Sequence, residues 1–262
     1  MQAIEHIIQR PPQQTHQTPL LFQHGAWHGA WCWQQWLDYF TSLGYEVHAI
    51  SLPGHGQSVP HKHINLFTLG DYVNIMAATV DSIKPTPVVI GHSMGGAIVQ
   101  KYLEKRSLPA AVLLATIPAG GILPMMLRWL RHYPVSTLKG LLTLNGYHFV
   151  GTPALAQAFF FSEECGVDVP AVHAQLVRES LTLATQTMIP FARRPVGDTP
   201  VLVLAGEKDF LFSVPEQRKT AEKYNATFVE FPDQAHNLML EPAWQQVANT
   251  IDDWLINQVK LP

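Results

Sequence analysis

An apolar run at residues 87–90 leads directly into the hexamer Gly91-His92-Ser93-Met94-Gly95-Gly96, and a segment of helical character follows at residues 97–103. A strand that passes at once into a helix needs a sharp turn. Glycines on both sides of Ser93 leave room for a strained backbone and for close approach of the strand to the helix. The new helix would point its free N–H groups and the positive end of its dipole back at the turn. The hexamer therefore predicts a turn that presents one serine hydroxyl beside an oxyanion-binding site.

Short apolar runs alternate with segments of helical periodicity along most of the chain. Strands are predicted at residues 20–23, 46–50, 87–90, 111–115, 200–205 and 227–231. Helices are predicted at residues 31–43, 68–84, 97–103, 214–224 and from about 241 to 259, the last with Pro242 in its first turn. This alternation is typical of the α/β class, in which helices cover both faces of a mostly parallel sheet. Ligands of such folds bind beyond the carboxyl ends of the strands.

The alternation stops between about Pro118 and Pro195. Helical patches at residues 123–132, 135–144, 153–161 and 169–187 follow one another there without a strand between them. We interpret residues 118–195 as a helical cap inserted over the active edge of the sheet. Residues 1–117 and 196–262 then form the core.

Composition excludes several classes of partner. Net charge is −3, only 14% of residues are charged, and no basic stripe indicates a nucleic-acid surface. Residues 1–19 lack the pattern of a signal peptide, and no segment approaches the ~20 apolar residues of a membrane span. We expect a cytoplasmic protein with no membrane span. The sequence leaves its oligomeric state open.

A serine hydroxyl becomes a nucleophile only beside a base, and that base needs a group that orients it. His236 follows the predicted strand 227–231 by a short loop, and Asp209 follows the predicted strand 200–205. Both positions lie at the sheet edge that carries Ser93. We therefore predict Ser93 as nucleophile, His236 as base and Asp209 as the orienting carboxylate. Two other carboxylates lie near this edge, Glu207 and Asp233, and the second is too close to His236 in the chain to reach behind its ring.

This chain order, together with the hexamer, resembles the serine hydrolase branch of the α/β-hydrolase family. Residues 24–33, His-Gly-Ala-Trp-His-Gly-Ala-Trp-Cys-Trp, resemble the family's early oxyanion turn. The resemblance implies that the backbone N–H groups of Ala26 and Met94 form an oxyanion hole, in which each donor is worth about 3–4 kcal/mol. Residues 52–58 resemble a third family motif, but Ser51 stands where many members carry Asp. A salt bridge made by that Asp is expected to be missing.

The resemblance also narrows the reaction. Dehalogenases and epoxide hydrolases of this family use Asp at the position of Ser93. Hydroxynitrile lyases have a similar oxyanion region but carry Thr at the position of Ala26 and Lys at that of Asn237. We therefore expect hydrolysis of a carboxylic ester with an apolar acyl or alkyl group, as in carboxylesterases, lysophospholipases, monoglyceride lipases and plant methylesterases.

Other activities stay open, because a fold does not set a substrate. They include action on thioesters, lactones or amides, a lyase-like activity, and ligand binding or signalling with slow turnover.

Four aromatic or thioether side chains are candidates for the substrate pocket, with packing of the cap onto the sheet as the alternative. They are Trp27, Met125, Trp129 and Phe160.

No metal and no cofactor are expected. The histidine pairs 24/28 and 61/63 lack a carboxylate or cysteine that would complete a metal site. The run Gly54-His55-Gly56 lacks the third glycine of a dinucleotide fingerprint. Cys32 and Cys165 are expected to be free thiols.

Overall fold

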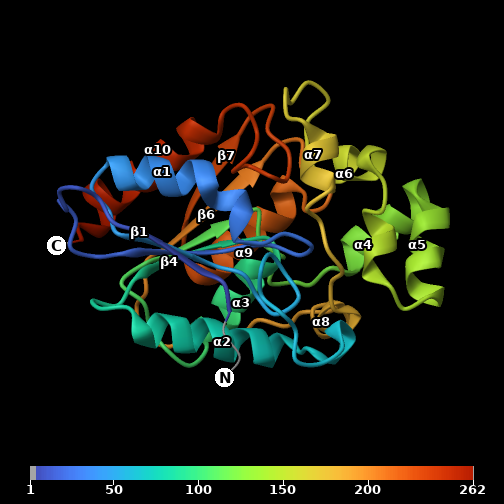
Figure 1. The fold of residues 1–262 in the computed structure, drawn as a ribbon, viewed down its shortest axis with the longest axis horizontal. Coiled ribbons are helices and arrows are strands. Elements are labelled where there is room, and N and C mark those ends of the chain that lie inside the picture. Colours follow the sequence, from blue (N-terminus) through green and yellow to red (C-terminus); the bar gives the residue numbers. More distant parts are fainter. Residues whose placement is uncertain (1–3, 262) are drawn as a thin grey trace.

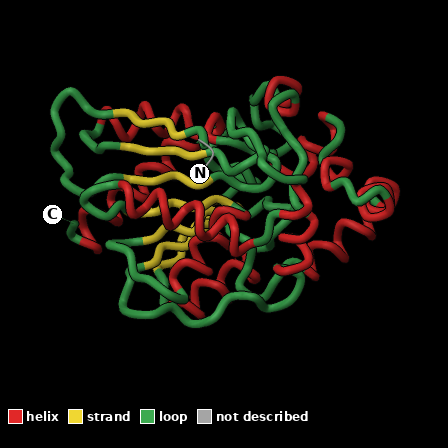
Figure 2. The backbone as a smooth tube through the Cα atoms, turned by 60° about the horizontal axis from the view of Figure 1, so that its bottom comes forward, coloured by secondary structure: helices red, strands yellow, loops and turns green. Residues whose placement is uncertain are grey.

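A computed structural model describes residues 4–261 as a seven-stranded sheet between layers of helices (Figure 1, Figure 2). The strand order is β1-β3-β2-β4-β5-β6-β7, and all pairs are parallel except β1 with β3. The strands are β1 (His6–Gln9), β2 (Leu20–Gln23), β3 (Val47–Ile50), β4 (Val88–His92), β5 (Ala111–Leu114), β6 (Val201–Gly206) and β7 (Thr227–Phe231). This architecture confirms the predicted α/β-hydrolase fold class.

Both faces of the sheet are covered, which explains why its central strands read as continuous apolar runs. Helices α1 (Gln34–Ser42) and α10 (Trp244–Trp254) pack on one face. The other face carries α2 (Leu69–Ser82), α3 (Met94–Leu103) and α9 (Val214–Tyr224). In Figure 1, α1 and α10 lie above the sheet and α2 lies below it.

The first strand was not predicted. β1 pairs antiparallel with β3 at the sheet edge, and its four residues, His-Ile-Ile-Gln, are only partly buried. An edge strand with polar ends lacks the long apolar run that identified the central strands.

Helix boundaries follow local signals where these are strong. The predicted capping box is present, because Thr68 Oγ1 accepts from the Asp71 N–H and the Asp71 carboxylate accepts from the Thr68 N–H. The helix predicted at 31–43 begins as a 3₁₀ turn, η1 (Ala30–Trp33), before α1. The last helix begins at Trp244, so Pro242 lies in the preceding turn and not in the first turn of the helix. It ends in a π-helical turn, η4 (Leu255–Val259).

The segment between β5 and β6 is helical throughout its regular structure. Residues 169–187 form two short helices and not one. The helices of this segment are α4 (Leu123–His132), α5 (Pro134–Leu142), α6 (Pro153–Phe160), α7 (Val169–His173) and α8 (Leu181–Gln186), and it also contains the 3₁₀ turn η3 (Gly146–Phe149). Another 3₁₀ turn, η2 (Ile64–Leu66), lies outside this segment, before α2. The buried side chains of the segment between β5 and β6 belong to the same apolar cluster as those of α2 and α3.

Within residues 4–261, no helix has both the length and the apolar character needed to cross a membrane.

Candidate active site

Ser93 occupies the strained turn between β4 and α3. Its backbone angles are φ 52° and ψ −113°, a region that non-glycine residues rarely adopt. The turn is held by a hydrogen bond from the Ser93 N–H to Leu114 O of 2.9 Å. A Cβ atom on Gly95 would lie 2.3 Å from Gln23 O, and one on Gly96 would lie 2.1 Å from Thr116 Oγ1. Glycine is therefore required at both positions for α3 to approach the neighbouring strands.

His236 and Asp209 are hydrogen-bonded to each other beyond the carboxyl ends of β7 and β6. His236 Nδ1 lies 2.8 Å from Asp209 Oδ2, and both side chains are 1% exposed. The other carboxylate oxygen, Asp209 Oδ1, accepts from the N–H groups of Leu211 and Phe212 at 2.7 and 3.0 Å. Because the ionised carboxylate only accepts, the proton of a neutral His236 ring lies on Nδ1. His236 Nε2 is then free to act as a base.

The segments that carry Ser93 and His236 are joined through His92. His92 Nε2 donates to His236 O at 3.1 Å, and the two ring centroids lie 4.8 Å apart. Burial, assisted by the neighbouring His236 ring, holds the pKa of His92 well below its usual value, so this ring is neutral near pH 7. The hydrogen bonds of residues 4–261 include none between the Ser93 hydroxyl and His236. Hydrogen bonds between a nucleophile and its base often tighten only when substrate binds.

Two unpaired backbone donors flank Ser93. Ala26 and Met94 line the same cavity as Ser93, and neither N–H donates a hydrogen bond within the described part of the chain. Met94 is the first residue of α3, where no intrahelical acceptor exists for its N–H. The Ala26 turn is held by His28, whose Nδ1 donates to Ala26 O at 2.7 Å.

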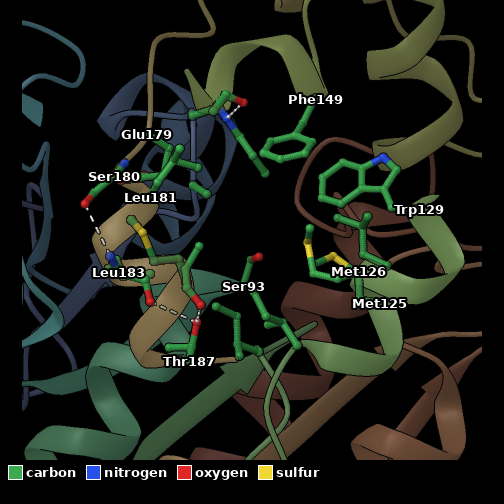
Figure 3. Close-up of a pocket in the computed structure, with 18 of the residues that line it drawn as sticks. Ser93, Met125, Met126, Trp129, Phe149, Glu179, Ser180, Leu181, Leu183 and Thr187 are labelled. Atoms are coloured by element: carbon green, nitrogen blue, oxygen red, sulfur yellow. Dashed lines mark hydrogen bonds between the residues drawn. The ribbon is translucent and has the colours of Figure 1, made fainter. Parts of the chain in front are cut away.

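The cavity above Ser93 is small and almost entirely apolar. It encloses about 70 Å³, and Figure 3 shows the Ser93 hydroxyl pointing into it. Trp27, Met125 and Trp129, three of the four candidates for a substrate pocket, line this cavity. Its remaining lining residues include Ile117, Ile122, Met126, Phe149, Leu181, Leu183, Ala184, Thr187, Leu211 and Phe212.

Phe160 does not line this cavity. Its ring centroid lies 5.1 Å from that of His28, 5.9 Å from that of Trp27 and 6.0 Å from that of His236. The Phe160 side chain therefore packs against the His236, His28 and Trp27 rings outside the cavity.

Sequence reasoning missed Glu179, a buried carboxylate in the cavity wall. Glu179 Oε2 accepts from His55 Nε2 at 2.9 Å, and Oε1 accepts from the Ser180 N–H at 2.6 Å. The only signal in the sequence was His55 in the Gly54-His55-Gly56 run, because a histidine that becomes buried needs a polar partner for its ring nitrogens. That partner lies 124 residues away, in the helical segment, and nothing in the local sequence points to it.

A carboxylate also serves the turn at Ser51, although the family's Asp is absent. Glu5 Oε2 accepts from Ser51 Oγ at 2.5 Å and from the Gln57 N–H at 3.0 Å. Ser51 Oγ in turn accepts from the Ala30 N–H at 2.8 Å. Glu5, which directly precedes β1, therefore supplies a carboxylate contact at this turn in place of the absent Asp.

Residues 4–261 contain no group of three or more His, Cys, Asp or Glu side chains arranged to hold a metal ion. The two cysteines are free and buried. His24, of the histidine pair 24/28, hydrogen-bonds to the backbone, because its Nδ1 donates to Gly25 O and its Nε2 accepts from the Leu52 N–H.

Two plant proteins are similar to parts of this chain. The chloroplastic putative methylesterase 15 of Arabidopsis thaliana is 34% identical over 83 residues, which are 31% of this chain and 18% of that protein. The pFDCC methylesterase MES16 of the same plant is 30% identical over 108 residues, which are 39% of this chain and 41% of that protein. The matching stretches thus span less than half of either relative.

Solved structures agree over nearly the whole fold. The monoacylglycerol lipase of Paleococcus ferrophilus superposes with a TM-score of 0.71 at 19% identity, and the match covers 97% of this chain and 98% of that chain. An identity this low shows a shared fold alone.

The sequence model of the alpha/beta hydrolase family matches residues 20–250. This match begins with β2, ends within α10 and includes the turn at Ser93 and the Asp209–His236 pair. Since it spans most of the chain, the protein belongs to the alpha/beta hydrolase family.

Proposed function

We propose that this protein is a serine hydrolase that cleaves a carboxylic ester with an apolar acyl or alkyl group. The observation that carries the proposal is the position of the Ser93 hydroxyl, which points into an apolar cavity. The hydrogen-bonded pair His236 and Asp209 lies at the same edge of the sheet as Ser93. The plant relatives are named methylesterases, which makes methyl esters of apolar acids a natural substrate class to test.

The reaction follows from these groups. Ser93 Oγ attacks the ester carbonyl while His236 Nε2 takes its proton, and the Ala26 and Met94 N–H groups bind the oxyanion. His236 then protonates the departing alcohol, which leaves an acyl group on Ser93. Water, activated by the same histidine, releases the acid and restores the serine. Asp209 holds the imidazole ring in place and stabilises its charged form.

A panel of nitrophenyl and methyl esters tests this reaction. Ser93→Ala removes the nucleophile, and we expect loss of at least about 10³-fold in kcat/KM, in line with removal of a nucleophilic serine. Ser136→Ala, at a serine on α5 outside the cavity lining, is the matched control and is expected to retain full activity. Circular dichroism verifies that both variants are folded. Activity that survives Ser93→Ala would overturn the mechanism, and a wild-type protein that hydrolyses no ester but is thermally stabilised by one would favour ligand binding without turnover.

A further inference from the structure

The helices α4 and α5 carry an unusual set of exposed apolar side chains. They follow one another with only Tyr133 between them and pack together at one end of the molecule (Figure 1). We call residues 123–142 the cap hairpin. More than half of the exposed large apolar side chains among the described residues lie on this hairpin or directly after it: Leu123, Leu127, Leu130, Val135, Leu138, Leu141, Leu142 and Leu144.

Helix α4 has apolar side chains on two faces, and only one of these faces is buried against the rest of the protein. Met125 and Trp129 are buried and line the cavity above Ser93. Leu123, Leu127 and Leu130 recur at the spacing of one helix face and are 45%, 59% and 43% exposed. A helix with apolar residues on two faces is normally buried on both. The outer face of α4 is therefore apolar but exposed to solvent, which indicates that another molecule binds there.

Helix α5 repeats this pattern. Its buried positions are small, Thr137 and Gly140, and Gly140 lies against the Phe149 ring. Val135 is 79% exposed and Leu142 is 83% exposed. Single exposed leucines are ordinary, but a cluster of them on consecutive helices marks an interaction surface.

Charge indicates what this surface contacts. The chain has a net charge of −3, yet residues 105–162 contain no Asp or Glu at all. Arg131 and Lys139 are exposed on the hairpin, and no ion pair of residues 4–261 involves either of them. The other arginine of the hairpin, Arg128, pairs with Glu216 of α9 and so braces the hairpin against the core. Exposed leucines mixed with unpaired basic side chains are the composition of helices that lie in a lipid interface.

We propose that the cap hairpin docks on an anionic lipid surface, with its leucines among the acyl chains and with Arg131 and Lys139 on the headgroups. Because Met125 and Trp129 on the inner face of the same helix line the cavity, docking brings the active-site pocket next to the lipid. A protein interface fits the surface less well, since such interfaces are enriched in aromatic residues and polar rims. The proposal concerns binding alone and stands whether or not Ser93 is a nucleophile.

Co-sedimentation with vesicles tests the proposal. We expect the full-length protein to bind vesicles that contain about a third phosphatidylglycerol in phosphatidylcholine. We expect binding to be at least about ten-fold weaker on pure phosphatidylcholine and to weaken as salt is raised. Leu127→Glu/Leu142→Glu places two charges among the leucines and is expected to reduce binding by at least about ten-fold. Arg131→Glu/Lys139→Glu is expected to remove the preference for anionic vesicles.

The control variant is Ile256→Glu, at a comparably exposed apolar side chain beyond the end of α10, far from the cap hairpin. It is expected to bind vesicles as wild type does. All variants are expected to keep the circular dichroism spectrum and melting temperature of wild type, which shows that they are folded. The proposal is overturned if wild type does not bind anionic vesicles, or if the leucine variant binds as well as wild type. It is equally overturned if wild type is a dimer that the leucine variant converts to monomers while neither binds vesicles, because the surface would then contact a second copy.

Discussion

The side-chain amide nitrogen of Asn237 lies 3.1 Å from His28 Nε2, and this contact joins the loop after β2 to the loop after β7. His28 Nδ1 also donates to Ala26 O, so its Nε2 must accept from Asn237. One imidazole ring thereby fixes the position of a proposed oxyanion donor relative to the proposed base, because Asn237 directly follows His236.

Loss of this link is expected to reduce catalysis more than substrate binding. Asn237→Ala leaves His28 Nε2 buried without its donor, and we expect kcat to fall by about ten-fold, the equivalent of one hydrogen bond of about 1–1.5 kcal/mol. KM for a short ester is expected to change little, because neither side chain lines the cavity. Steady-state kinetics of Asn237→Ala, His28→Ala and the double variant check this. Fully additive losses in the double variant would contradict the link.

Burial of His28 is expected to make stability depend on pH. It lowers the pKa of His28 to about 4, whereas an unfolded histidine has its pKa near 6.5. Between these values the unfolded chain binds more protons than the folded one, so the free energy of unfolding rises with pH. For this residue the difference amounts to roughly 3 kcal/mol, lost as pH falls from about 6.5 to 4. Burial shifts the pKa values of His24 and His92 in the same direction.

Urea unfolding at several pH values from 7 to 4.5 measures this dependence. We expect His28→Gln to flatten the slope without abolishing it, because His24 and His92 still contribute. A slope identical to that of wild type would show that the buried ring is not the source.

Gly95 is expected to tolerate no side chain. Gly95→Ala brings a methyl group onto the backbone oxygens of Gln23 and His24, neither of which can move without distorting the sheet. We expect a loss of at least about 2 kcal/mol in stability, typical of overpacking in a rigid site. Thermal unfolding checks this, with Gly120→Ala as the matched control, because a Cβ there meets nothing within 4 Å. Equal melting temperatures for the two variants would refute the steric argument.

Cavity volume is expected to set acyl-chain preference. About 70 Å³ accommodates a short group, so we expect kcat/KM to decline as the acyl chain of a nitrophenyl ester lengthens beyond a few carbons. Met126→Ala removes a lining side chain and is expected to shift the optimum to longer chains. Leu127→Ala changes the next residue, which faces solvent, and serves as the control with an unchanged optimum. An optimum that moves equally in both variants would rule out the cavity as its cause.

Glu5 is expected to stabilise the turn after β3. Glu5→Ala removes the acceptor shared by Ser51 Oγ and the Gln57 N–H, and we expect a loss of about 1–2 kcal/mol. Denaturant unfolding measures it against Asp253→Ala, a surface carboxylate on α10. A loss no larger than that of the control would mean that water replaces the carboxylate.

Most of the sheet and the turn at Ser93 could be predicted because their signals are local. The strands β2 to β6 each contain mostly apolar residues, the capping box at Thr68 spans four residues, and Gly91 and Gly95 each lie two residues from Ser93. That Asp209 and His236 lie at the same edge of the sheet could also be predicted, because each follows the carboxyl end of a predicted parallel strand. In the structure a hydrogen bond joins the two side chains.

The contacts that only tertiary structure decided join segments far apart in the chain. Glu179 meets His55 across 124 residues, and Glu5 meets Ser51 across 46. The path of the helical segment likewise decided that Phe160 packs against His236 while Phe149 lines the cavity. The sequence alone determined the α/β architecture and the turn at Ser93, since backbone sterics and apolar periodicity act within a few residues. Which carboxylate meets which histidine, and how large the cavity is, depend on the packing of remote side chains, for which local sequence carries no signal.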